Sequence, residues 1–407
     1  MTKSDRSAKT ALNNINSNSP HLKFYTDNKI SPVFQRVTNI NHLLEYRESL
    51  YKGVGISALA IRGSDVLEVA AGSGQNSLFI ASCLPNSLTL VDPNPTSIEQ
   101  ITDVYSKFNR KHTKPQLIPK MLEDFRSKIQ FDIVVCENWL GRKNYERQLF
   151  KKLLDLTKPS GVMITTVISP IGILPNFIRR ALSARLVSTT HKFDEKEKML
   201  VSAFSSHLKS IQAMTRPKID WVQDNMINPG YLDICITLPE LLKGVGKDFD
   251  VLGCYPRFCQ DWRWFKSLHG QNRKFNKILE SEYYKWCHGF LSYKMTVKEG
   301  SVEKNRLLEA KCIKFIGLVK KFESLPIGQS QVHKKPMNDM ISTLMSICDL
   351  AKDIYSPEIF NQLLEGFSLL KSKTLKSSDI SNCKKFNTLF GRETLYISVE
   401  RIKDNKL

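Results

Sequence analysis

Short apolar segments alternate with amphipathic segments between residues 41 and 168. The apolar segments are nearly continuous and cover residues 65–70, 87–91, 116–121, 131–136 and 162–168. The segments between them have apolar residues at helical spacing and cover 41–56, 76–83, 96–110 and 144–156, with a turn at 159–161. Strands that are apolar throughout are typical of a parallel sheet covered by helices on both faces. The pattern therefore predicts an α/β fold with a doubly wound, Rossmann-like sheet.

The regular alternation ends at residue 169, and the rest of the chain is mainly helical. Residues 171–186 predict a basic amphipathic helix, and strand patterns return only at 248–254 and 394–401. We therefore expect predominantly helical insertions within the sheet. The expected parts are a flexible lead-in (1–35), an α/β core (36–169), a helical cap (170–247), a sixth core strand (248–256), a mainly helical insertion (257–392) and a C-terminal core strand (393–407).

The charge of the chain calls for a partner, but does not identify it. The 407 residues have a formal net charge of +20. Such a field attracts nucleic acid, anionic lipid or phosphorylated substrates. Lysines that lie on solvated helix faces for solubility alone produce the same net charge. No stretch reaches the roughly 18 uncharged apolar residues of a membrane span, and the first 20 residues lack the apolar segment of a secretory signal. With nine scattered cysteines, this predicts a cytoplasmic protein with reduced thiols.

A strand, a glycine-rich turn and a helix follow one another in VLEVAAGSGQNSLF, residues 66–79. Gly72 and Gly74 permit positive φ and a close approach of the backbone to a ligand, as in turns that hold nucleotide-like molecules. Taken alone, the turn is also an ordinary tight connection in an α/β protein. Glu68 makes the signal more specific, because a carboxylate inside a buried strand is costly without a partner.

Further acidic residues follow the next two strands. Asp92 ends the second strand 20 residues after Gly72, at the spacing where a carboxylate accepts the hydroxyls of a ribose. Glu123 and Asp124 follow the third strand, where an acid can accept the amino group of an adenine ring, and Asp124 is slightly favoured.

The segments VLEVAAGSGQNSLF, LTLVDPNP, MLEDF, FDIVVCENWL and KPSGVMITTVIS resemble successive motifs of class I S-adenosylmethionine-dependent methyltransferases. One departure is Ala70, where many members have glycine, although a small residue still permits the turn. The resemblance implies S-adenosylmethionine as the cofactor. The residues that it assigns to the cofactor are Glu68, Ala70, Gly72, Gly74, Asn76, Asp92, Pro93, Glu123, Asp124, Glu137 and Asn138.

The same resemblance predicts how the sheet closes. In this family a seventh strand, antiparallel to its neighbours, inserts between the fifth and the sixth. We therefore expect residues 394–401 to be that strand, which makes 170–247 and 257–390 insertions in the sheet. The alternative is an independent C-terminal helical domain whose final strand lies at an edge.

The tripeptide after the fourth strand, Glu137-Asn138-Trp139, should lie at the reaction centre, because this strand end faces both cofactor and acceptor in the family. The adenine- and cytosine-amino DNA methyltransferases resemble each other in having an (N/D/S)-P-P-(Y/F/W) motif there. No proline follows Glu137, and no Pro-Cys supplies a nucleophile for C5 methylation. The DNA amino-methyltransferases and the DNA C5-cytosine methyltransferases are therefore excluded.

Tryptophan, arginine and aspartate are concentrated in residues 214–225 and 255–270. Aromatic faces and Arg or Asp hydrogen bonds hold sugars and other polar ligands, although a packed interdomain seam has the same composition. The expected acceptor pocket consists of Trp139, Arg216, Asp220, Trp221, Arg257, Trp262, Arg263 and Trp264. Together with FGRETLYIS, these segments also resemble a bacterial group of uncharacterised methyltransferases, which are often associated with surface-glycan biosynthesis.

A general base assists methyl transfer to a hydroxyl, and the candidates are Glu137, Asp220, Asp261 and His269. A histidine titrates nearest to neutral pH, but a lone histidine is more often structural. We retain Glu137, Asp261 and His269 as the catalytic candidates. No group of residues has metal-ligand spacing, so no metal is expected.

Three functions fit these observations. The leading one is methyl transfer to a hydroxyl or amine of a small molecule or glycan precursor. The second is an RNA or other nucleic-acid methyltransferase, suggested by the charge and by Arg179, Arg180 and Arg185 on the basic helix. The third is a non-catalytic binding module that keeps the fold, against which the intact glycine-rich turn and its acids argue.

Overall fold

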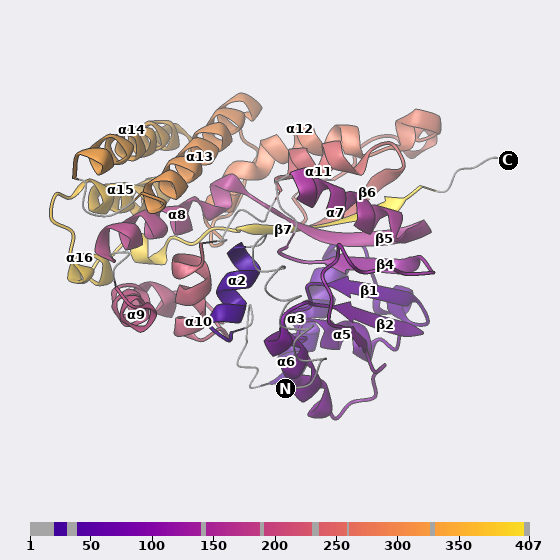
Figure 1. The fold of residues 1–407 in the computed structure, drawn as a ribbon. Helices are drawn as coiled ribbons and strands as arrows, with labels where there is room; N and C mark the ends of the chain where they lie inside the picture. The colour runs from indigo at the N-terminus through magenta and orange to yellow at the C-terminus, as the bar shows by residue number, and fades with distance from the viewer. Residues whose placement is uncertain are drawn as a thin grey trace, which may run out of the picture.

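The structure is a computed structural model that describes residues 20–30, 39–139, 144–187, 191–229, 236–258, 260–325 and 330–402. It consists of a sheet-containing unit and a helical unit (Figure 1). The C-terminal strand β7 runs from the helical unit into the sheet. The chain therefore returns to the sheet after completing the helical unit.

Seven strands form one sheet in the order β3-β2-β1-β4-β5-β7-β6. The strands are β1 (Asp65–Val69), β2 (Ser87–Val91), β3 (Gln116–Ile118), β4 (Phe131–Cys136), β5 (Thr157–Ile168), β6 (Phe249–Tyr255) and β7 (Thr394–Arg401). The first five are parallel, and β7 is antiparallel to both β5 and β6. The prediction that 394–401 inserts between the fifth and sixth strands is confirmed.

Alternate residues of the central strands pack into two different cores. Ile133 and Val135 of β4 join one core with Tyr51 and Phe79, whereas Val134 of β4 joins the other. The first face is covered by α3 (Ile40–Gly53), α5 (Ser77–Ser82) and α6 (Pro95–Ser106), and α4 (Ala58–Ile61) precedes β1. The second face is covered by α7 (Asn144–Asp155) and α11 (Leu238–Val245). Burial on both faces explains why the strands are apolar throughout.

The turn expected at 159–161 lies inside β5. Ser160 has a φ of +62°, and the register between β4 and β5 shifts between Phe131 and Ile133. This irregularity lets one strand continue through the Pro-Ser-Gly sequence. The strand therefore begins at Thr157, before the expected turn.

The helical unit surrounds α8 (Pro170–Leu186), which contacts α13, α15 and neighbouring segments. Its other α-helices are α9 (Phe193–Lys209), α10 (Lys218–Val222), α12 (Asn276–Trp286), α13 (Val302–Glu323), α14 (Ser330–Ile354), α15 (Pro357–Lys371) and α16 (Ser377–Ser381). The shorter helical segments of the described chain are η1 (Gln223–Ile227), η2 (Phe265–Ser267), η3 (Gly270–Arg273), η4 (Cys287–Leu291) and η5 (Phe386–Thr388), of which η2 and η3 belong to the loop beside β6. None of the described helices is long and apolar enough to cross a bilayer.

The prediction that 171–186 is a basic amphipathic helix is wrong in one respect, because α8 has no basic face exposed to solvent. Arg179 is fully buried between the rings of Phe386 and Phe390, with its guanidinium carbon 4.7 and 3.7 Å from the ring centroids. Arg180 forms a paired contact with Glu323, at 2.9 Å for each of two hydrogen bonds. Arg185 donates to backbone carbonyls at the end of α15. Internal partners thus satisfy the charges that the sequence pattern placed at the surface.

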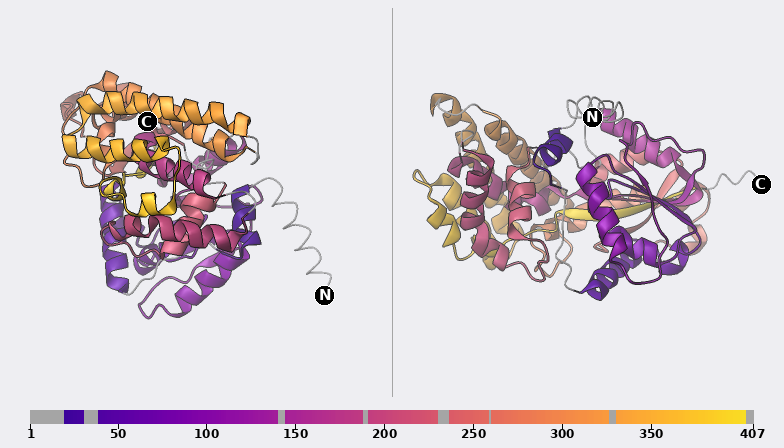
Figure 2. Two further views of the ribbon diagram at one scale, coloured as in Figure 1. Left: turned by 90° about the vertical axis from the view of Figure 1, so that its left-hand side faces the viewer. Right: turned by 60° about the horizontal axis from the view of Figure 1, so that its bottom comes forward.

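A helix that the sequence analysis did not anticipate lies within the expected lead-in. Helix α2 (Pro20–Asp27) sits between the helical unit and the sheet unit in Figure 1 and in the right-hand view of Figure 2. Tyr25 is 3% exposed, and its hydroxyl donates to Asp224 of η1 at 2.5 Å. On the other side, the Asn94 amide donates to the carbonyl of Ile30 at 3.1 Å. This segment therefore connects the two units at the end of the sheet where β2 terminates.

Candidate active site

The carboxyl ends of β1, β2 and β4 meet at one edge of the sheet. Val69 is in register with Val91 of β2 and with Cys136 of β4. The residues that follow these strands, the turn 70–74, Asp92 and Glu137, consequently lie side by side. Ligands of doubly wound sheets bind at this edge.

The glycine-rich turn needs three left-handed residues. Ala70, Gly72 and Gly74 have φ values of +59°, +57° and +74°. A Cβ atom built on Gly74 would lie 2.8 Å from Cγ1 and 3.3 Å from Cα of Ile101 in α6. Gly74 is therefore required by the packing of α6 against the turn. Ala70 adopts a conformation that costs a non-glycine residue about 1 kcal/mol.

Asp92 is tied to the turn through its carboxylate. Its Oδ2 accepts from the Gly72 amide and its Oδ1 from the Asn94 amide, each at 2.9 Å. The side chain is 5% exposed, and burial raises the pKa of Asp92 to about 6, although these two amides oppose the rise. Each carboxylate oxygen keeps a second lone pair that can accept a ribose hydroxyl. Asp92 can therefore hold the loop and accept hydrogen bonds from a ligand at the same time.

Glu68 is a buried carboxylate with an unsatisfied oxygen. Its side chain is 4% exposed, and within the described part of the chain Oε2 has no hydrogen-bond partner. Burial, together with the charges of Glu137 and Asp92, raises the pKa of Glu68 to about 8, against the opposing effect of Arg47. Leaving such a group unpaired is costly, so a ligand that brings positive charge or donors to this edge would be favoured.

Arg47 of α3 forms a buried ion pair with Glu137. Its Nη2 and Nη1 donate to Glu137 Oε1 and Oε2 at 2.5 and 3.0 Å, and both side chains are under 10% exposed. The guanidinium also lies 5.2 Å from the ring centroid of Tyr51. Burial acts to lower the pKa of Arg47, but the Glu137 carboxylate raises it, and the net pKa lies above the ordinary value. The ion pair therefore holds Glu137 as an oriented carboxylate.

Arg47 is a site residue that the motifs of the sequence do not reveal. The available signal was its position on the apolar face of the expected helix, four residues before Tyr51 and three after Leu44. A charged residue on a buried helix face requires a partner. The partner follows a strand 90 residues later, and the sequence pattern does not reveal that pairing.

The neighbours of Glu137 are also fixed. Asn138 has a φ of +56°, which asparagine tolerates better than most residues. Its amide donates to Thr166 Oγ1 at 2.7 Å, and the Thr394 hydroxyl donates to its side-chain oxygen at 3.4 Å. Trp139 is partly buried and packs against the larger core. Strands β5 and β7 therefore position the end of β4.

The two acids after β3 differ in their surroundings. Asp124 is exposed, whereas Oε2 of Glu123 is buried and has no partner among the described residues. Lys152 of α7 holds this turn by donating to the carbonyls of Leu122 and Phe125 at 2.5 and 2.7 Å. The geometry thus favours Glu123 over Asp124 as the acid available to a ligand.

The residues expected in the first acceptor segment lie within the helical unit, next to its contact with α2. Arg216 pairs with Asp224 at 2.9 Å, and Asp224 also accepts from Tyr25 of α2. Trp221 is 7% exposed and packs edge-on against Phe390. Asp220 is partly buried in α10. Trp221 is thus a core residue, as the alternative of a packed seam predicts.

The structure separates the residues of the second expected acceptor segment, 255–270, into those that line a cavity and those that do not. Arg257 and Trp262 line a cavity of about 480 Å³ with Phe258, Trp286, Phe290 and Arg392. The cavity adjoins the end of β6 and the start of β7, and both lie at the carboxyl edge because β6 is parallel to β5. Tyr255 lies three strands from the end of β4, about 14 Å at the usual spacing.

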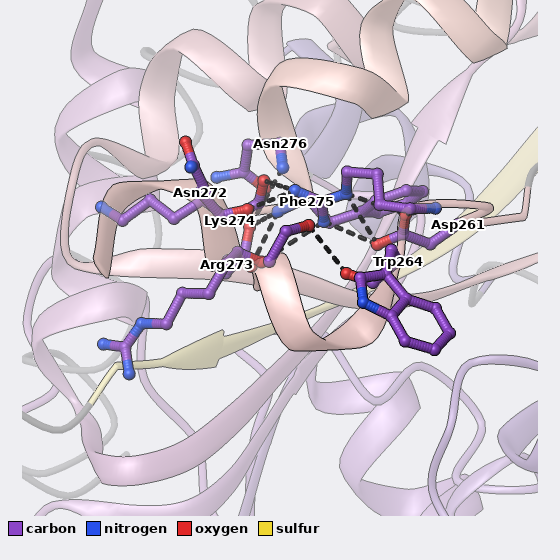
Figure 3. A network of polar contacts seen from close by, with 10 residues as sticks. Asp261, Trp264, Asn272, Arg273, Lys274, Phe275 and Asn276 are labelled. Carbon is purple, nitrogen blue, oxygen red and sulfur yellow. Dashed lines mark hydrogen bonds and ion pairs between the residues drawn. The ribbon is translucent and has the colours of Figure 1, made fainter. Parts of the chain in front are cut away.

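Asp261, Arg263 and Trp264 do not line that cavity. Asp261 accepts two short hydrogen bonds from Arg263, which lower the pKa of Asp261, and Arg263 also donates to the carbonyl of Lys274 at 3.1 Å (Figure 3). The segment then joins the start of β6, because the Phe275 amide donates to Asp250 at 2.9 Å. That end of β6 is opposite to the edge with Glu137. The structure therefore does not bring these three residues together with Glu137, and His269 is an exposed residue of the same segment.

The remaining expected cofactor residues are close to the turn. Asn76 precedes α5 in a helical conformation without a side-chain cap bond, and Pro93 follows Asp92 before α6 begins. In the described residues, no group of three or more His, Cys, Asp or Glu side chains is arranged to hold a metal ion.

The strand order with an inserted antiparallel strand, and the acids at the ends of β1 and β2, define a class I S-adenosylmethionine-dependent methyltransferase core. Residues 66–161 match the family model described as "Methyltransferase domain". Residues 66–161 therefore carry a methyltransferase domain, and the strand order is that of the class I fold, whose members use S-adenosylmethionine. The unpaired oxygens of Glu68 and Glu123 and the free lone pairs of Asp92 fit such a cofactor.

The chain is also similar to solved methyltransferase structures. The N-methyltransferase NodS from Bradyrhizobium japonicum, crystallised with S-adenosyl-L-homocysteine, has 15% identity over 32% of this chain, with a TM-score of 0.26. An S-adenosylmethionine-dependent methyltransferase from Clostridium acetobutylicum has 15% identity over 33%, with a TM-score of 0.27. The arsenic(III) methyltransferase CrArsM from Chlamydomonas reinhardtii has 18% identity over 31%, with a TM-score of 0.25.

This chain spans 64%, 53% and 48% of those three chains, respectively. No curated protein sequence matches it.

Proposed function

We propose that the protein transfers the methyl group of S-adenosylmethionine to a hydroxyl or amine of a small molecule or glycan precursor. The observation that carries this proposal is the group of buried carboxylates Glu68, Asp92 and Glu137 around the glycine-rich turn. S-adenosylmethionine has a sulfonium and an ammonium group and no phosphate. A site rich in carboxylates suits that charge distribution.

Each acid has a separate task under this proposal. Asp92 would accept the ribose hydroxyls while it holds the turn through Gly72, and Glu123 would accept the adenine amino group. Glu68 would offer its unpaired oxygen to the methionine part. When bound, the cofactor supplies an electrophilic methyl group on sulfur.

The transfer itself is an in-line displacement that needs alignment more than acid–base chemistry. Arg47 fixes the Glu137 carboxylate through two hydrogen bonds, so Glu137 acts as an oriented acceptor at the reacting edge. In that position it can hold the proton of an incoming hydroxyl or ammonium group. Glu137 is the catalytic candidate best placed for this role, since it follows β4 at the carboxyl edge, whereas the loop with Asp261 is joined to the start of β6.

The body of the acceptor would occupy the cavity beside β6 and β7. Its lining combines the aromatic side chains of Phe258, Trp262 and Trp286 with the guanidinium of Arg257. Aromatic faces and a charged hydrogen-bond donor suit a sugar or another polar ring. The strand spacing of about 14 Å from β4 requires an acceptor long enough to reach from this cavity to Glu137.

The nucleic-acid alternative loses its main structural support, because Arg179 and Arg180 are buried and Arg185 caps α15. We place the reaction in the cytoplasm, a reducing compartment that suits the seven buried free cysteines of the described residues.

Calorimetry with S-adenosylmethionine, followed by transfer of labelled methyl groups into a fractionated cell extract, tests this function. We expect binding, and labelling of a polar low-molecular-weight fraction. Arg257→Ala should raise KM for that acceptor without changing cofactor affinity, while Arg273→Ala, an exposed change in the same segment outside the cavity, should leave both unchanged. Cofactor binding without any labelled product would support the non-catalytic module instead. Labelled RNA would support the nucleic-acid alternative.

A further inference from the structure

Three large aromatic side chains project into solvent from one short loop. Trp262, Phe265 and Trp264 are 88%, 66% and 63% exposed. They are three of the four most exposed large hydrophobic residues in the described chain. Single exposed apolar residues are ordinary, but such a cluster marks an interaction surface. We call residues 260–275 the aromatic loop.

The aromatic loop is held in shape by a polar network rather than by a hydrophobic core. Arg263 joins the two ends of the loop, because it donates to the Asp261 carboxylate and to the carbonyls of Asn272 and Lys274, three residues that Figure 3 labels. Trp264 projects away from this network in the same view, and its carbonyl accepts from the Ser267 amide at 2.9 Å. The network thus fixes the backbone while its aromatic side chains stay outside.

The loop and its flanks are strongly basic. Residues 256–277 include six Lys or Arg and a single acid, Asp261, which Arg263 neutralises. The ammonium of Lys266 lies 5.9 Å from the ring centroids of both Trp264 and Phe265. A positively charged rim around exposed indole rings is complementary to an anionic surface that has an apolar layer beneath it.

We propose that the aromatic loop docks the protein on an anionic phospholipid membrane, with Trp264 and Phe265 entering the headgroup region. Tryptophan is favoured there because its ring is apolar and its N–H remains hydrogen-bonded. Lys266, Arg273 and Lys277 contact the lipid phosphates. The docking does not depend on the proposed methyl transfer.

The geometry favours a membrane over single-stranded nucleic acid. Bases stack on flat, accessible platforms along a basic groove. Here Trp264 and Phe265 pack against each other, with centroids 4.9 Å apart and planes inclined by 54°. They form a projecting wedge, which suits insertion between headgroups.

Co-sedimentation with vesicles tests the proposal on the full chain. The wild-type protein should sediment with vesicles containing phosphatidylglycerol, only weakly with phosphatidylcholine alone, and less as salt increases. Trp264→Ser with Phe265→Ser should weaken binding at least about tenfold, because the lost apolar area no longer enters the interface. Neither residue lines the cavity beside β6. Lys266→Glu with Arg273→Glu should abolish the preference for anionic vesicles.

The matched control is Leu59→Ser, a change at a 77% exposed residue of α4. It should bind vesicles like the wild type, and equal melting temperatures would show that all variants are folded. Addition of anionic vesicles should also shift the tryptophan fluorescence to shorter wavelength, less so in the aromatic double variant. The proposal is overturned if the wild type does not sediment with anionic vesicles or if the aromatic variant sediments equally. It is also overturned if those aromatics are needed only for retention on single-stranded RNA.

Discussion

Glu68 makes the stability of the cofactor domain depend on pH in a direction opposite to that of a typical acid. Its folded-state pKa is about 8, chiefly through burial, against 4.5 for an ordinary glutamate. The folded protein therefore keeps a proton that the unfolded chain releases. This contribution to stability is fully present below pH 4.5 and is lost as pH rises through 8.

The size of the effect follows from the gap between the two pKa values. That gap corresponds to at most about 5 kcal/mol, and relaxation of a buried site leaves on the order of a few kcal/mol. Glu68→Gln removes the titration and preserves the shape. The variant should therefore be less sensitive to pH than the wild type, and its stability advantage should grow by at most about 2.7 kcal/mol as pH rises from 6 to 8.

Urea unfolding at pH 6, 7.5 and 9 measures this difference. Glu99→Gln, an exposed change on α6, is the control and should follow the wild type at each pH. Asp92 titrates near pH 6, so the comparison rests on the range above 7. Parallel stability curves for the wild type and Glu68→Gln from pH 6 to 9 would refute the buried, unpaired carboxylate.

The remaining predictions concern the turn and the C-terminal strand. Asp92→Ala should weaken S-adenosylmethionine binding by roughly 1.5 to 3 kcal/mol in calorimetry through lost charge-assisted hydrogen bonds, and unchanged affinity in a folded variant would exclude the ribose assignment. Ala70→Gly should raise the free energy of unfolding by about 0.5–1 kcal/mol by relieving the positive φ, whereas the same change at Ala81 in α5 should lower it by about 1 kcal/mol. Deleting residues 392–407 should destabilise the cofactor domain, since β7 is an inner strand; a truncated chain that melts like the full chain would contradict this.

The sheet could be predicted from the sequence because its strands are buried on both faces, so nearly every residue of each strand is apolar. Strand β7 was predictable for a related reason, since Leu395, Ile397 and Val399 alternate with more polar residues and are all fully buried. The acids of the cofactor site were predictable because they directly follow strands. For these acids, the place in the sequence directly after a strand is enough to give their place at the edge of the sheet.

The remaining features depend on pairings that no local pattern contains. The sequence pattern predicts that Arg179 is an exposed cation. In the structure it contacts backbone carbonyls and aromatic rings of residues more than 200 positions later in the chain. Arg47 and Glu137 become a pair only when α3 covers the sheet. Trp262 and Trp264 are near neighbours in sequence, yet only Trp262 lines the cavity, because Arg263 ties the loop back toward the start of β6.

The insertion of β7 between β5 and β6 also imposes an order of events on synthesis. Ile168 pairs with Thr394, so one strand leaves the ribosome long before its partner. Closing a loop of that length costs about 5 kcal/mol of chain entropy, and the pairing of β7 offsets this cost only after residues 394–401 have been translated. Until then β5 and β6 both present unpaired edges, which are the usual starting points of aggregation. The nascent chain thus depends on residues 394–401 to close the sheet, and a ribosome that stalls between β6 and β7 would release a protein with two unpaired strand edges.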